Sequence, residues 1–520
     1  MMVRDKAPLG QTGAGAVQGV WQDGVAAFRG VPYAAAPVGV LRFAPPAPVA
    51  PWDGVRSAEH QAVAPPQPVS RGDAAMGLMD VPGYDEDCLT LNVWTPSPGS
   101  AERLPVLVWL HGGGFMFGSG SASWYDGSVM ARRGQMVVVS VSYRLGALGW
   151  LYFAPGTLGP EAVANLGLQD QCQALEWVRD NIAAFGGDPG KVTVAGQSAG
   201  GLSIVGLHAM PRAAGLFRRA IVQSSGPAVP AHSIERGAYV TKAFCEAAER
   251  TERDLLTLPV NAIIDAQNRT LMRIGMEGGY DPRLNPPLAM TFQLVVDGEV
   301  LPADPVEAAR KGSMDQTDLM ILCTPEEMRF ATAFDETWWA RDHQAVVAQL
   351  TAAGGSEFVS LFEAYTALQP DAPAPDILIH MITDINCVLP SIELAERRAA
   401  IGKPAHFAWF TWWSQAANGR LGPGHTIELP FVFNNIRTHW SNAPMLAGAD
   451  PDALQKLADR VQDAWIAFAT NGSPGEGWPA YTLRERWAME FGSSVGTMRN
   501  PAGERRALWL NRGRPSWIDA

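Results

Sequence analysis

The sequence predicts an α/β protein with a central, mostly parallel twisted sheet that is flanked by helices. Two observations support this fold class: several short runs of apolar, β-branched residues, and a helix-periodic segment that lies between two of them. Continuous apolar runs are typical of strands covered on both faces, and strands that alternate with helices form parallel sheets with crossover helices. The runs with this character are 104–110, 136–143, 192–195, 220–222, 318–322 and 405–410.

A crossover helix is expected over residues 168–182. Apolar residues recur in it every three or four positions, at Leu168, Cys172, Leu175, Val178 and Ile182. This spacing predicts a helix with one buried stripe. The segment 185–189, Phe-Gly-Gly-Asp-Pro, contains strong helix breakers and is expected to end the helix.

The middle of the chain is richer in Ala, Glu and Arg, and stretches such as 239–258 and 344–368 read as helices. No internal repeat and no long polar linker marks a domain boundary. The middle could be a separate domain or helical insertions over a continuing sheet. We expect one domain over residues 1–520, although about 150 residues per domain is the usual prior. Its core is expected at roughly 1–235 and 290–520, with helical insertions over the active site at roughly 236–290 and 330–400.

The composition is that of a folded protein, with 47% hydrophobic and 18% charged residues. The net charge of −12 makes the chain a poor partner for the phosphates of nucleic acids or for anionic lipid surfaces. We therefore expect neither nucleic-acid binding nor membrane binding.

The cysteines are scattered singly, without a Cys-x-x-Cys pair, at Cys88, Cys172, Cys245, Cys323 and Cys387. This spacing argues against a zinc site and against a dense disulfide framework. The first residues lack the continuous apolar core of a signal peptide, and the most apolar window, 136–155, contains Arg144. We expect a cytoplasmic protein that needs no metal ion and no organic cofactor.

Residues 196–200 read Gly-Gln-Ser-Ala-Gly, which is a Gly-x-Ser-x-Gly motif. A strand-like run precedes it and a small-residue helical stretch, 199–210, follows it, as a nucleophilic serine on a strand-to-helix turn requires. The flanking glycines prevent clashes, and the helix N-terminus favours developing negative charge. A plain turn with an idle serine is the alternative, because the chain contains 53 glycines. The context favours Ser198 as a nucleophile.

Residues 111–115, His-Gly-Gly-Gly-Phe, directly follow the strand predicted at 104–110. A tetrahedral acyl intermediate needs backbone N–H groups that point at its oxyanion, and consecutive glycines allow the backbone to approach closely. The amides of Gly113, Gly114 and Ala199 would supply three such donors. The alternative is a flexible glycine turn.

The serine needs a general base, and the chain has nine histidines. His425 lies in a loop, 421–430, shortly after the strand predicted at 405–410, where a base can reach over the serine. His111 belongs to the glycine loop and is interpreted as structural. No supporting context surrounds His60, His208, His232, His343, His380 or His439.

A carboxylate should orient the imidazole and stabilise its protonated form. With this serine motif the order along the chain is nucleophile, acid, histidine, so the acid should follow a strand between 198 and 425. The strand predicted at 318–322 is followed by Cys-Thr-Pro-Glu-Glu-Met. Glu326 and Glu327 are both candidates, and an ordinary solvated turn is the alternative.

Longer segments resemble the type-B carboxylesterase/lipase family of α/β-hydrolases, which includes bacterial para-nitrobenzyl esterases and the cholinesterases. Residues 28–33 with 37–43, and residues 86–93 (Glu-Asp-Cys-Leu-Thr-Leu-Asn-Val), resemble two signatures of the family. The resemblance covers most of the chain and implies the α/β-hydrolase fold. Further matches lie at 143–146 (Tyr-Arg-Leu-Gly), 165–168 (Asn-Leu-Gly-Leu) and 185–189.

The resemblance implies a serine esterase in which Ser198 is the nucleophile and His425 the base. It likewise implies that Gly113, Gly114 and Ala199 form the oxyanion hole. The family's Gly-Gly-Gly-x loop is associated with a roomy pocket that accepts bulky alcohol groups, even tertiary ones.

The family's acid lies in a Gly-Thr-Asn-x-Asp-Glu-like turn, which here is one residue shorter. Glu327 is the better match to the acid, and Glu326 stays open. Gln197 stands where many members carry Glu, and no cysteine precedes Cys88 to form the bridge of secreted relatives. Cholinesterases hold their substrate cation against a Trp in the segment before this cysteine. No Trp lies here at 54–87, so the resemblance does not imply choline-ester specificity.

Trp-rich segments and the segment 431–433 are candidates for an aromatic pocket, with core packing as the alternative. The side chains expected to contact substrate are Phe115, Gln197, Trp338, Trp412 and Phe431. We expect a serine carboxylesterase of broad specificity that forms an acyl-enzyme with small-molecule esters and has room for bulky or aromatic groups. We expect it to be a monomer or weak homo-oligomer. The alternatives are an amidase, carbamate hydrolase or lactonase with the same residues, and a non-catalytic binding protein of this fold.

Overall fold

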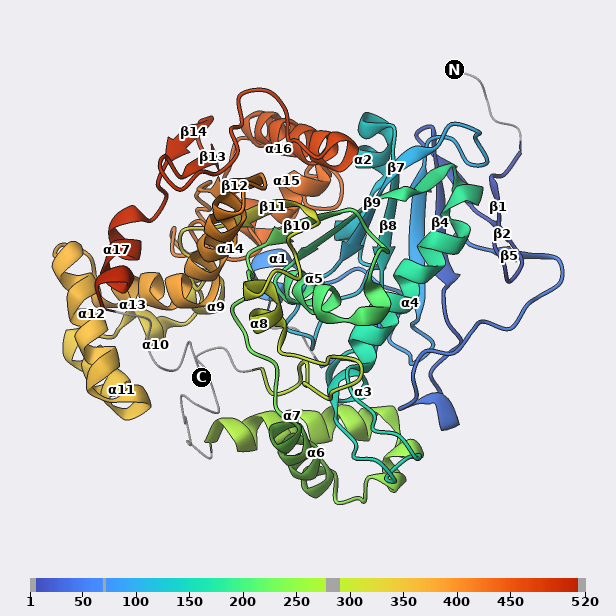
Figure 1. Cartoon of the computed structure of the whole chain (residues 1–520), viewed down its shortest axis with the longest axis horizontal. Coiled ribbons are helices and arrows are strands. Elements are labelled where there is room, and N and C mark those ends of the chain that lie inside the picture. The colour runs from blue at the N-terminus through green and yellow to red at the C-terminus, as the bar shows by residue number, and fades with distance from the viewer. Residues whose placement is uncertain (1–5, 69–71, 277–289, 513–520) are drawn as a thin grey trace.

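The computed structural model describes residues 6–68, 72–276 and 290–512. Within these residues, eleven strands form one sheet in the order β14-β13-β12-β11-β10-β9-β7-β8-β6-β4-β3 (Figure 1). They are β3 (Val20–Gln22), β4 (Val25–Pro32), β6 (Thr90–Thr95), β7 (Leu104–Leu110), β8 (Val137–Val141), β9 (Gly187–Gln197), β10 (Arg219–Gln223), β11 (Asp318–Cys323), β12 (Ala405–Phe410), β13 (Trp487–Phe491) and β14 (Val495–Arg499). A small second sheet contains β1 (Leu9–Gln11), β2 (Ala16–Gln18) and β5 (Val55–Ser57).

The middle of the large sheet is parallel and its ends are antiparallel. Every neighbouring pair from β8 through β7, β9, β10, β11 and β12 to β13 runs parallel. The pairs β13–β14, β3–β4, β4–β6 and β6–β8 run antiparallel. The predicted α/β class with a mostly parallel sheet is confirmed.

The predicted start of the strand at residue 192 is wrong. The helix α4 (Leu166–Asn181) is followed by a short 3-10 turn, Ile182–Phe185, and β9 already begins at Gly187 instead of at the predicted 192. Gly187 pairs with Leu104 across the sheet, so Gly187, Asp188 and Pro189 belong to the strand, whereas Gly186 ends the 3-10 turn. Strand pairing with a neighbour outweighs the local turn preference of these residues.

Helices cover both faces of the sheet. Along β7, Val106, Val108 and Leu110 belong to one core and Leu107 and Trp109 to the other, as expected for side chains that alternate between faces. The first core includes residues of α4, α5 (Ala199–Ala209), α6 (Ile234–Ala248), α7 (Val260–Met276), α8 (Pro305–Arg310) and α14 (Leu389–Ala400). The second includes residues of α2 (Ser128–Gly134), α15 (Leu429–Phe433) and α16 (Pro451–Asn471).

A third cluster of buried side chains lies away from the sheet, in the helices at the left of Figure 1. The predicted helix at 344–368 is two helices, because Gly355 has φ 71° and separates them. The helices of this region are α9 (Arg329–Thr332), α10 (Glu336–Trp339), α11 (His343–Gly354), α12 (Ser356–Leu368), α13 (Ala374–Thr383) and α17 (Gly503–Arg512); α1 (Asp73–Met76) and α3 (Gly146–Trp150) lie elsewhere. The predicted helix at 239–258 ends at Ala248, and residues 277–289 of the expected insertion lie outside the described residues.

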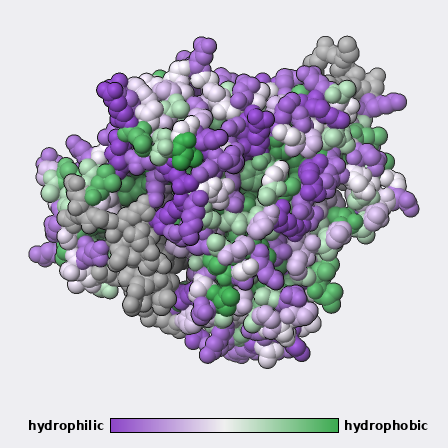
Figure 2. Space-filling model, viewed as in Figure 1, coloured by the Kyte–Doolittle hydropathy of each residue, from purple (hydrophilic) through white to green (hydrophobic). Residues whose placement is uncertain are grey.

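The surface and the cysteines agree with an ordinary globular protein. Figure 2 shows hydrophilic residues over much of one face, with hydrophobic residues scattered among them. By length and composition, one helical stretch in the described residues, Ala374–Ala400, could cross a membrane, but 72% of its most apolar window is buried inside the protein. All five cysteines are free.

Candidate active site

Ser198 lies on the turn between β9 and α5, as predicted. Its φ of 56° and ψ of −123° form a strained conformation for a residue other than glycine. Its N–H donates to the Gln223 carbonyl at 2.9 Å, and its carbonyl accepts from the Leu202 N–H at 2.9 Å. These contacts fix the serine at the N-terminus of α5, where the helix favours negative charge.

The two glycines of the serine motif are required by close packing against β7. A Cβ at Gly196 would lie 2.6 Å from the carbonyl carbon of Gly200. A Cβ at Gly200 would lie 2.0 Å from the carbonyl oxygen of Leu110. Only glycine permits backbones to approach this closely.

The glycine loop, residues 111–118, follows β7 and borders the same site. Gly113 and Gly114 have φ values of 107° and 61°, which favour glycine. Both line a cavity with Ser198, and Ala199 lines a second cavity with Ser198 and Gly114. The structure thus brings together the three residues that were predicted to supply oxyanion donors.

His111 packs at the start of this loop. Its side chain is fully buried, and its ring stacks on that of Tyr143 with centroids 4.3 Å apart. Burial lowers the pKa of His111 to about 4, although a hydrogen bond with the Gly112 carbonyl at 2.8 Å opposes this. The ring is therefore neutral near pH 7.

Gln67, which the sequence analysis did not single out, holds the far end of the glycine loop. Its side-chain amide donates to the Gly118 carbonyl at 2.9 Å and accepts from the Gly118 N–H at 2.8 Å. Gly118 has φ 105°, and a Cβ there would lie 2.4 Å from Nδ1 of His111. An isolated glutamine in a loop offers no sequence pattern that would reveal this pair of contacts.

His425 and Glu327 meet although 98 residues separate them. Nδ1 of His425 lies 2.6 Å from Oε2 of Glu327, and the His425 N–H donates to the Glu327 carbonyl at 3.0 Å. The other carboxylate oxygen of Glu327 accepts from the Thr324 N–H at 2.8 Å, and the residue is only 2% exposed. The carboxylate is therefore held by its own turn and oriented toward the imidazole.

The side chain of Glu326, the other candidate acid, is engaged elsewhere. It pairs with the guanidinium of Arg329, and its Oε1 lies 3.5 Å from Nε2 of His380. Burial raises the pKa of Glu326, but His380 and Arg329 outweigh burial and the net shift is downward. Arg329 in turn bonds Asp376 at 2.5 Å. Glu326 thus belongs to an ion-pair cluster beside the acid turn.

Nε2 of His425, the atom that would accept the serine proton, contacts the side-chain amide nitrogen of Gln197 at 3.1 Å. In the neutral ring, Nδ1–H then donates to Glu327 and the Nε2 lone pair accepts from Gln197. Burial lowers the pKa of His425, but the hydrogen bond and charge of Glu327 outweigh burial, so the net shift is upward.

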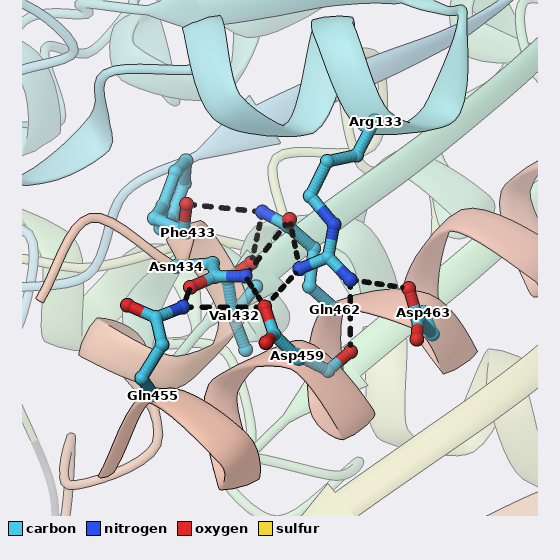
Figure 3. A network of polar contacts seen from close by, with 8 residues as sticks. All are labelled: Arg133, Val432, Phe433, Asn434, Gln455, Asp459, Gln462 and Asp463. Atoms are coloured by element: carbon cyan, nitrogen blue, oxygen red, sulfur yellow. Dashed lines mark hydrogen bonds and ion pairs between the residues drawn. The ribbon is translucent and has the colours of Figure 1, made fainter. Parts of the chain in front are cut away.

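The segment that follows His425 is anchored by a polar network between helices (Figure 3). Gln462 of α16 donates to the carbonyl of Phe433 at 3.0 Å, and Asn434 donates to Asp459 at 2.8 Å. Arg133 of α2 bonds Asp459 at 2.6 Å, with Val432, Gln455 and Asp463 completing the network. Helices α2 and α16 therefore fix the end of α15.

Glu428 is a buried carboxyl group that the sequence analysis missed. It is 0% exposed, and burial raises its pKa to about 7, with a further contribution from the charge of Glu327. Its Oε1 accepts from the Gln223 amide at 3.0 Å, and Gln223 accepts from the Trp465 indole N–H at 2.9 Å. Its position three residues after His425 is the only sequence signal, since such residues share one side of a helical turn.

Two cavities, each of about 280 Å³, meet at the serine. Both are lined by Gly114, Ser198, Phe330 and His425. The first is otherwise lined by Gln67, Gly72, Met76, Met79, Gly112, Gly113, Phe117, Gly118, Trp124, Tyr125, Gln197, Thr426 and Leu429. The second is otherwise lined by Ala199, Leu202, Ser224, Ser225, Val229, Met290, Glu327, Met328, Ala331, Asn386 and Cys387.

Of the five side chains expected to contact substrate, only Gln197 lines one of these two cavities. Phe115 is fully buried and packs on Trp150, with ring centroids 4.1 Å apart. Phe431 and Trp412 pack on each other at 5.3 Å, and Trp338 belongs to the third core cluster. Phe115, Trp338 and Phe431 are buried in the core clusters, and Trp412 is half-buried against the second core. The aromatic lining is Phe117, Trp124, Tyr125 and Phe330.

Among the residues that the structure describes, no group of three or more His, Cys, Asp or Glu side chains is placed to hold a metal ion. The arrangement at the two cavities combines a strained serine, an imidazole, a carboxylate oriented toward it, and glycine amides. Such a set can activate a hydroxyl group and stabilise an oxyanion.

Comparisons with known proteins agree with this arrangement. A model of the carboxylesterase family matches residues 6–509. The phenmedipham hydrolase of Pseudarthrobacter oxydans is 36% identical over 481 residues, which cover 91% of this chain and 93% of the relative. The para-nitrobenzyl esterase of Bacillus subtilis (strain 168) is 34% identical over 502 residues, which cover 95% of this chain and 96% of the relative.

Solved structures give the same result. A carboxylesterase of Geobacillus stearothermophilus superimposes with a TM-score of 0.83 at 32% identity, covering 96% of this chain and all of that one. A structure described as PNB esterase has a TM-score of 0.79 at 33% identity, and the match covers 96% of this chain and 99% of that one. The similarity therefore extends over nearly the whole length of both chains.

Proposed function

This chain belongs to the carboxylesterase family, has the α/β-hydrolase fold and is a carboxylic ester hydrolase; on that premise we propose that its catalytic triad is Ser198, His425 and Glu327. The observation that carries the assignment is the 2.6 Å contact between His425 and Glu327, beside two cavities that both reach Ser198. Glu327 is preferred over Glu326 because Glu326 pairs with Arg329 and His380.

In the proposed reaction, the Ser198 hydroxyl attacks the ester carbonyl while Nε2 of His425 takes its proton. The hydroxyl must first replace the Gln197 amide at Nε2. Glu327 keeps Nδ1 protonated and stabilises the imidazolium that forms. His425 then gives the proton to the leaving alcohol, and water hydrolyses the acyl-enzyme by the same route in reverse.

The negative charge that develops on the carbonyl oxygen is assigned to the amides of Gly113, Gly114 and Ala199. Their backbone N–H groups need no reorganisation during the reaction, since the glycine loop and the N-terminus of α5 already hold them in place. The pair of contacts from Gln67 to Gly118 supports the loop from its far end.

The two cavities support a broad specificity for esters with bulky or aromatic groups. The first is largely apolar, with Met76, Met79, Trp124 and Tyr125 in its wall, and suits such a group by burial of apolar surface. Because one relative is named phenmedipham hydrolase, we include phenmedipham as a second test substrate. An amidase, carbamate hydrolase or lactonase activity would use the same residues.

We also propose a single catalytic domain with helical insertions at roughly 236–290 and 330–400, and a monomer or weak homo-oligomer in the cytoplasm. The free cysteines support a reducing compartment. The net charge of −12 supports a protein that binds neither nucleic acids nor anionic membranes.

The test compares the wild type with Ser198→Ala on phenmedipham and, at pH 8, on the two esters p-nitrophenyl acetate and p-nitrophenyl butyrate. We expect the wild type to hydrolyse both, and Ser198→Ala to lose activity by a factor of about 10⁴ or more while its melting temperature stays close to that of the wild type. Ser225→Ala is the matched control, because Ser225 also lines the second cavity. Full activity in Ser198→Ala would exclude the assigned nucleophile.

A further inference from the structure

One wall of the second cavity is built from an uncommon element. Residues Asp384–Val388 form a π-helical turn between α13 and α14, and Asn386 and Cys387 of this turn line the cavity beside Ser198. Turns of this kind are rare, and they frequently lie at functional sites. The contacts that hold the turn therefore also shape the cavity.

The turn begins at a completely buried carboxylate. Asp384 is 0% exposed and accepts a hydrogen bond from the Tyr365 hydroxyl at 2.6 Å. Nε of Arg505 lies 3.1 Å from the same carboxylate oxygen. Burial raises the pKa of Asp384, and the charge of Arg505 opposes the shift. A buried carboxylate without these partners would be strongly destabilising.

Both contacts with Asp384 lead to the C-terminal helix α17, which lies beside α12 (Figure 1). Arg505 and Trp509 are four residues apart, so they face the same side of α17. The Trp509 indole N–H donates to the Tyr365 hydroxyl at 2.7 Å, and Trp509 is only 6% exposed. The polar contacts therefore run from Trp509 through Tyr365 to Asp384, while Arg505 reaches Asp384 directly.

The inner side of the turn packs against the strand ends that carry the site. The Cys387 thiol lies 3.7 Å from the Ser224 carbonyl, and the Cys323 thiol lies 3.6 Å from the Cys387 carbonyl. A guanidinium nitrogen of Arg505 also lies 3.5 Å from the Pro325 carbonyl, in the turn before Glu327. Movement of the π-helical turn would therefore alter the second cavity first.

We propose that Arg505 and Trp509 are positioning residues that set the shape of the second cavity through Asp384 and the π-helical turn, and thereby determine which ester groups the enzyme accepts. This inference rests on the proposed function, which makes the cavity part of the substrate site. The C-terminal helix is then a determinant of selectivity, although it lies outside the lining of the cavity.

The experiment compares kcat/KM for p-nitrophenyl acetate and p-nitrophenyl hexanoate in the wild type, Arg505→Met, Arg505→Lys and Trp509→Phe. We expect Arg505→Met and Trp509→Phe to change the hexanoate-to-acetate ratio by roughly fivefold or more, because the two esters lose kcat/KM to different extents. Arg505→Lys should restore most of the ratio, because it keeps the positive charge. Leu510→Ala is the matched control, since Leu510 lies on α17 and is 66% exposed.

An unchanged ratio in folded Arg505→Met and Trp509→Phe would overturn the inference, and so would an equal loss with both esters. If Arg505→Met does not fold, Trp509→Phe and Tyr365→Phe decide the question, because each removes only one hydrogen-bonding group. Ser198→Ala separates the two proposals. Activity in that variant would refute the proposed nucleophile, whereas an inactive Ser198→Ala with unchanged ratios in the α17 variants would refute only this inference.

Discussion

The nucleophile and the base–acid pair are held by different kinds of structure. Ser198 is positioned by backbone alone, on a turn between a buried strand and a buried helix, where glycines allow contacts as close as the packing of Gly200 on Leu110. Glu327 and His425 lie on loops after β11 and β12, and side-chain hydrogen bonds position them.

This difference separates steric from polar control. A substitution in the serine turn acts through overlap of atoms, which the fold cannot relieve locally. A substitution in the base–acid pair leaves the packing intact and changes charge and orientation. We therefore expect the two regions to respond differently to substitutions of similar size, and the four predictions below run from the largest effect to the smallest.

The largest effect is expected for Glu327→Gln in the base–acid pair. The variant is nearly isosteric, but it loses the charge that stabilises the imidazolium, so kcat should fall by about 10⁴ with little change in melting temperature. Glu326→Gln is the control, because Glu326 pairs with Arg329 and His380, and it should keep most of its activity. Steady-state kinetics check both, and the reverse pattern would assign the acid to Glu326.

The second effect concerns the serine turn. Gly200→Ala would place a Cβ 2.0 Å from the Leu110 carbonyl oxygen, and we expect a loss of about 4 kcal/mol or more in the free energy of unfolding. Denaturant unfolding measures this loss. Gly275→Ala is the control, because a Cβ there meets nothing within 4 Å. Wild-type stability in Gly200→Ala would show that the turn is not sterically fixed.

A smaller effect is expected for Glu428→Gln, a substitution close to the pair of His425 and Glu327. Burial raises the pKa of Glu428 to about 7 in the folded state. In the unfolded state the carboxyl has its ordinary pKa of about 4.3, so the folded state holds the proton more tightly. The wild type should therefore lose stability as the pH rises from about 4.3 through 7. The variant should avoid this loss, on the order of 2 kcal/mol at pH 8, and show no advantage at pH 4. Equal pH dependence of unfolding in both proteins would contradict the prediction.

The smallest effect links the two regions through Gln197. The pKa of His425 is raised above its ordinary value of about 6.5, and the base must be neutral, so kcat/KM should fall as the pH drops through that raised value. Gln197→Glu places a carboxylate near Nε2 of His425 and should move this acid limb upward by about one pH unit. Gln197→Met removes the contact without adding charge and serves as control. If the acid limb of the kcat/KM profile lies at the same pH in Gln197→Glu as in the wild type, this would argue against the contact between residue 197 and His425.

Most of the sheet could be predicted because, in a protein of this size, continuous apolar runs of this length usually form strands that are covered on both faces. The run at 104–110 is the strand β7 residue for residue, and the run at 405–410 is β12. The early start of β9 could not be predicted, since Gly187 pairs with Leu104 of β7, which lies far away in the sequence. Local turn chemistry was outweighed by a neighbour that is distant in sequence.

The cavity lining shows the opposite case. Trp412 before the histidine and Phe431 after it were expected in the pocket, yet they pack on each other, whereas Phe330 and Trp124 line the cavities. Aromatic residues of the core and of the pocket are the same residue types and have the same spacing along the sequence. Only the arrangement of the elements distinguishes them.

The sequence by itself determined the six central strands of the sheet, β7 to β12, together with the strand-to-helix turn at Ser198 and the place of the glycine loop after β7. These features follow from local sterics and hydrophobic pattern, which act between residues that are close along the chain. Only the tertiary structure decided which glutamate faces His425, that Gln197 occupies Nε2, that Glu428 is buried near the pair, and that α17 supports the second cavity. Each of these depends on hydrogen bonds or desolvation between segments that meet only after folding, and no local pattern encodes such a meeting.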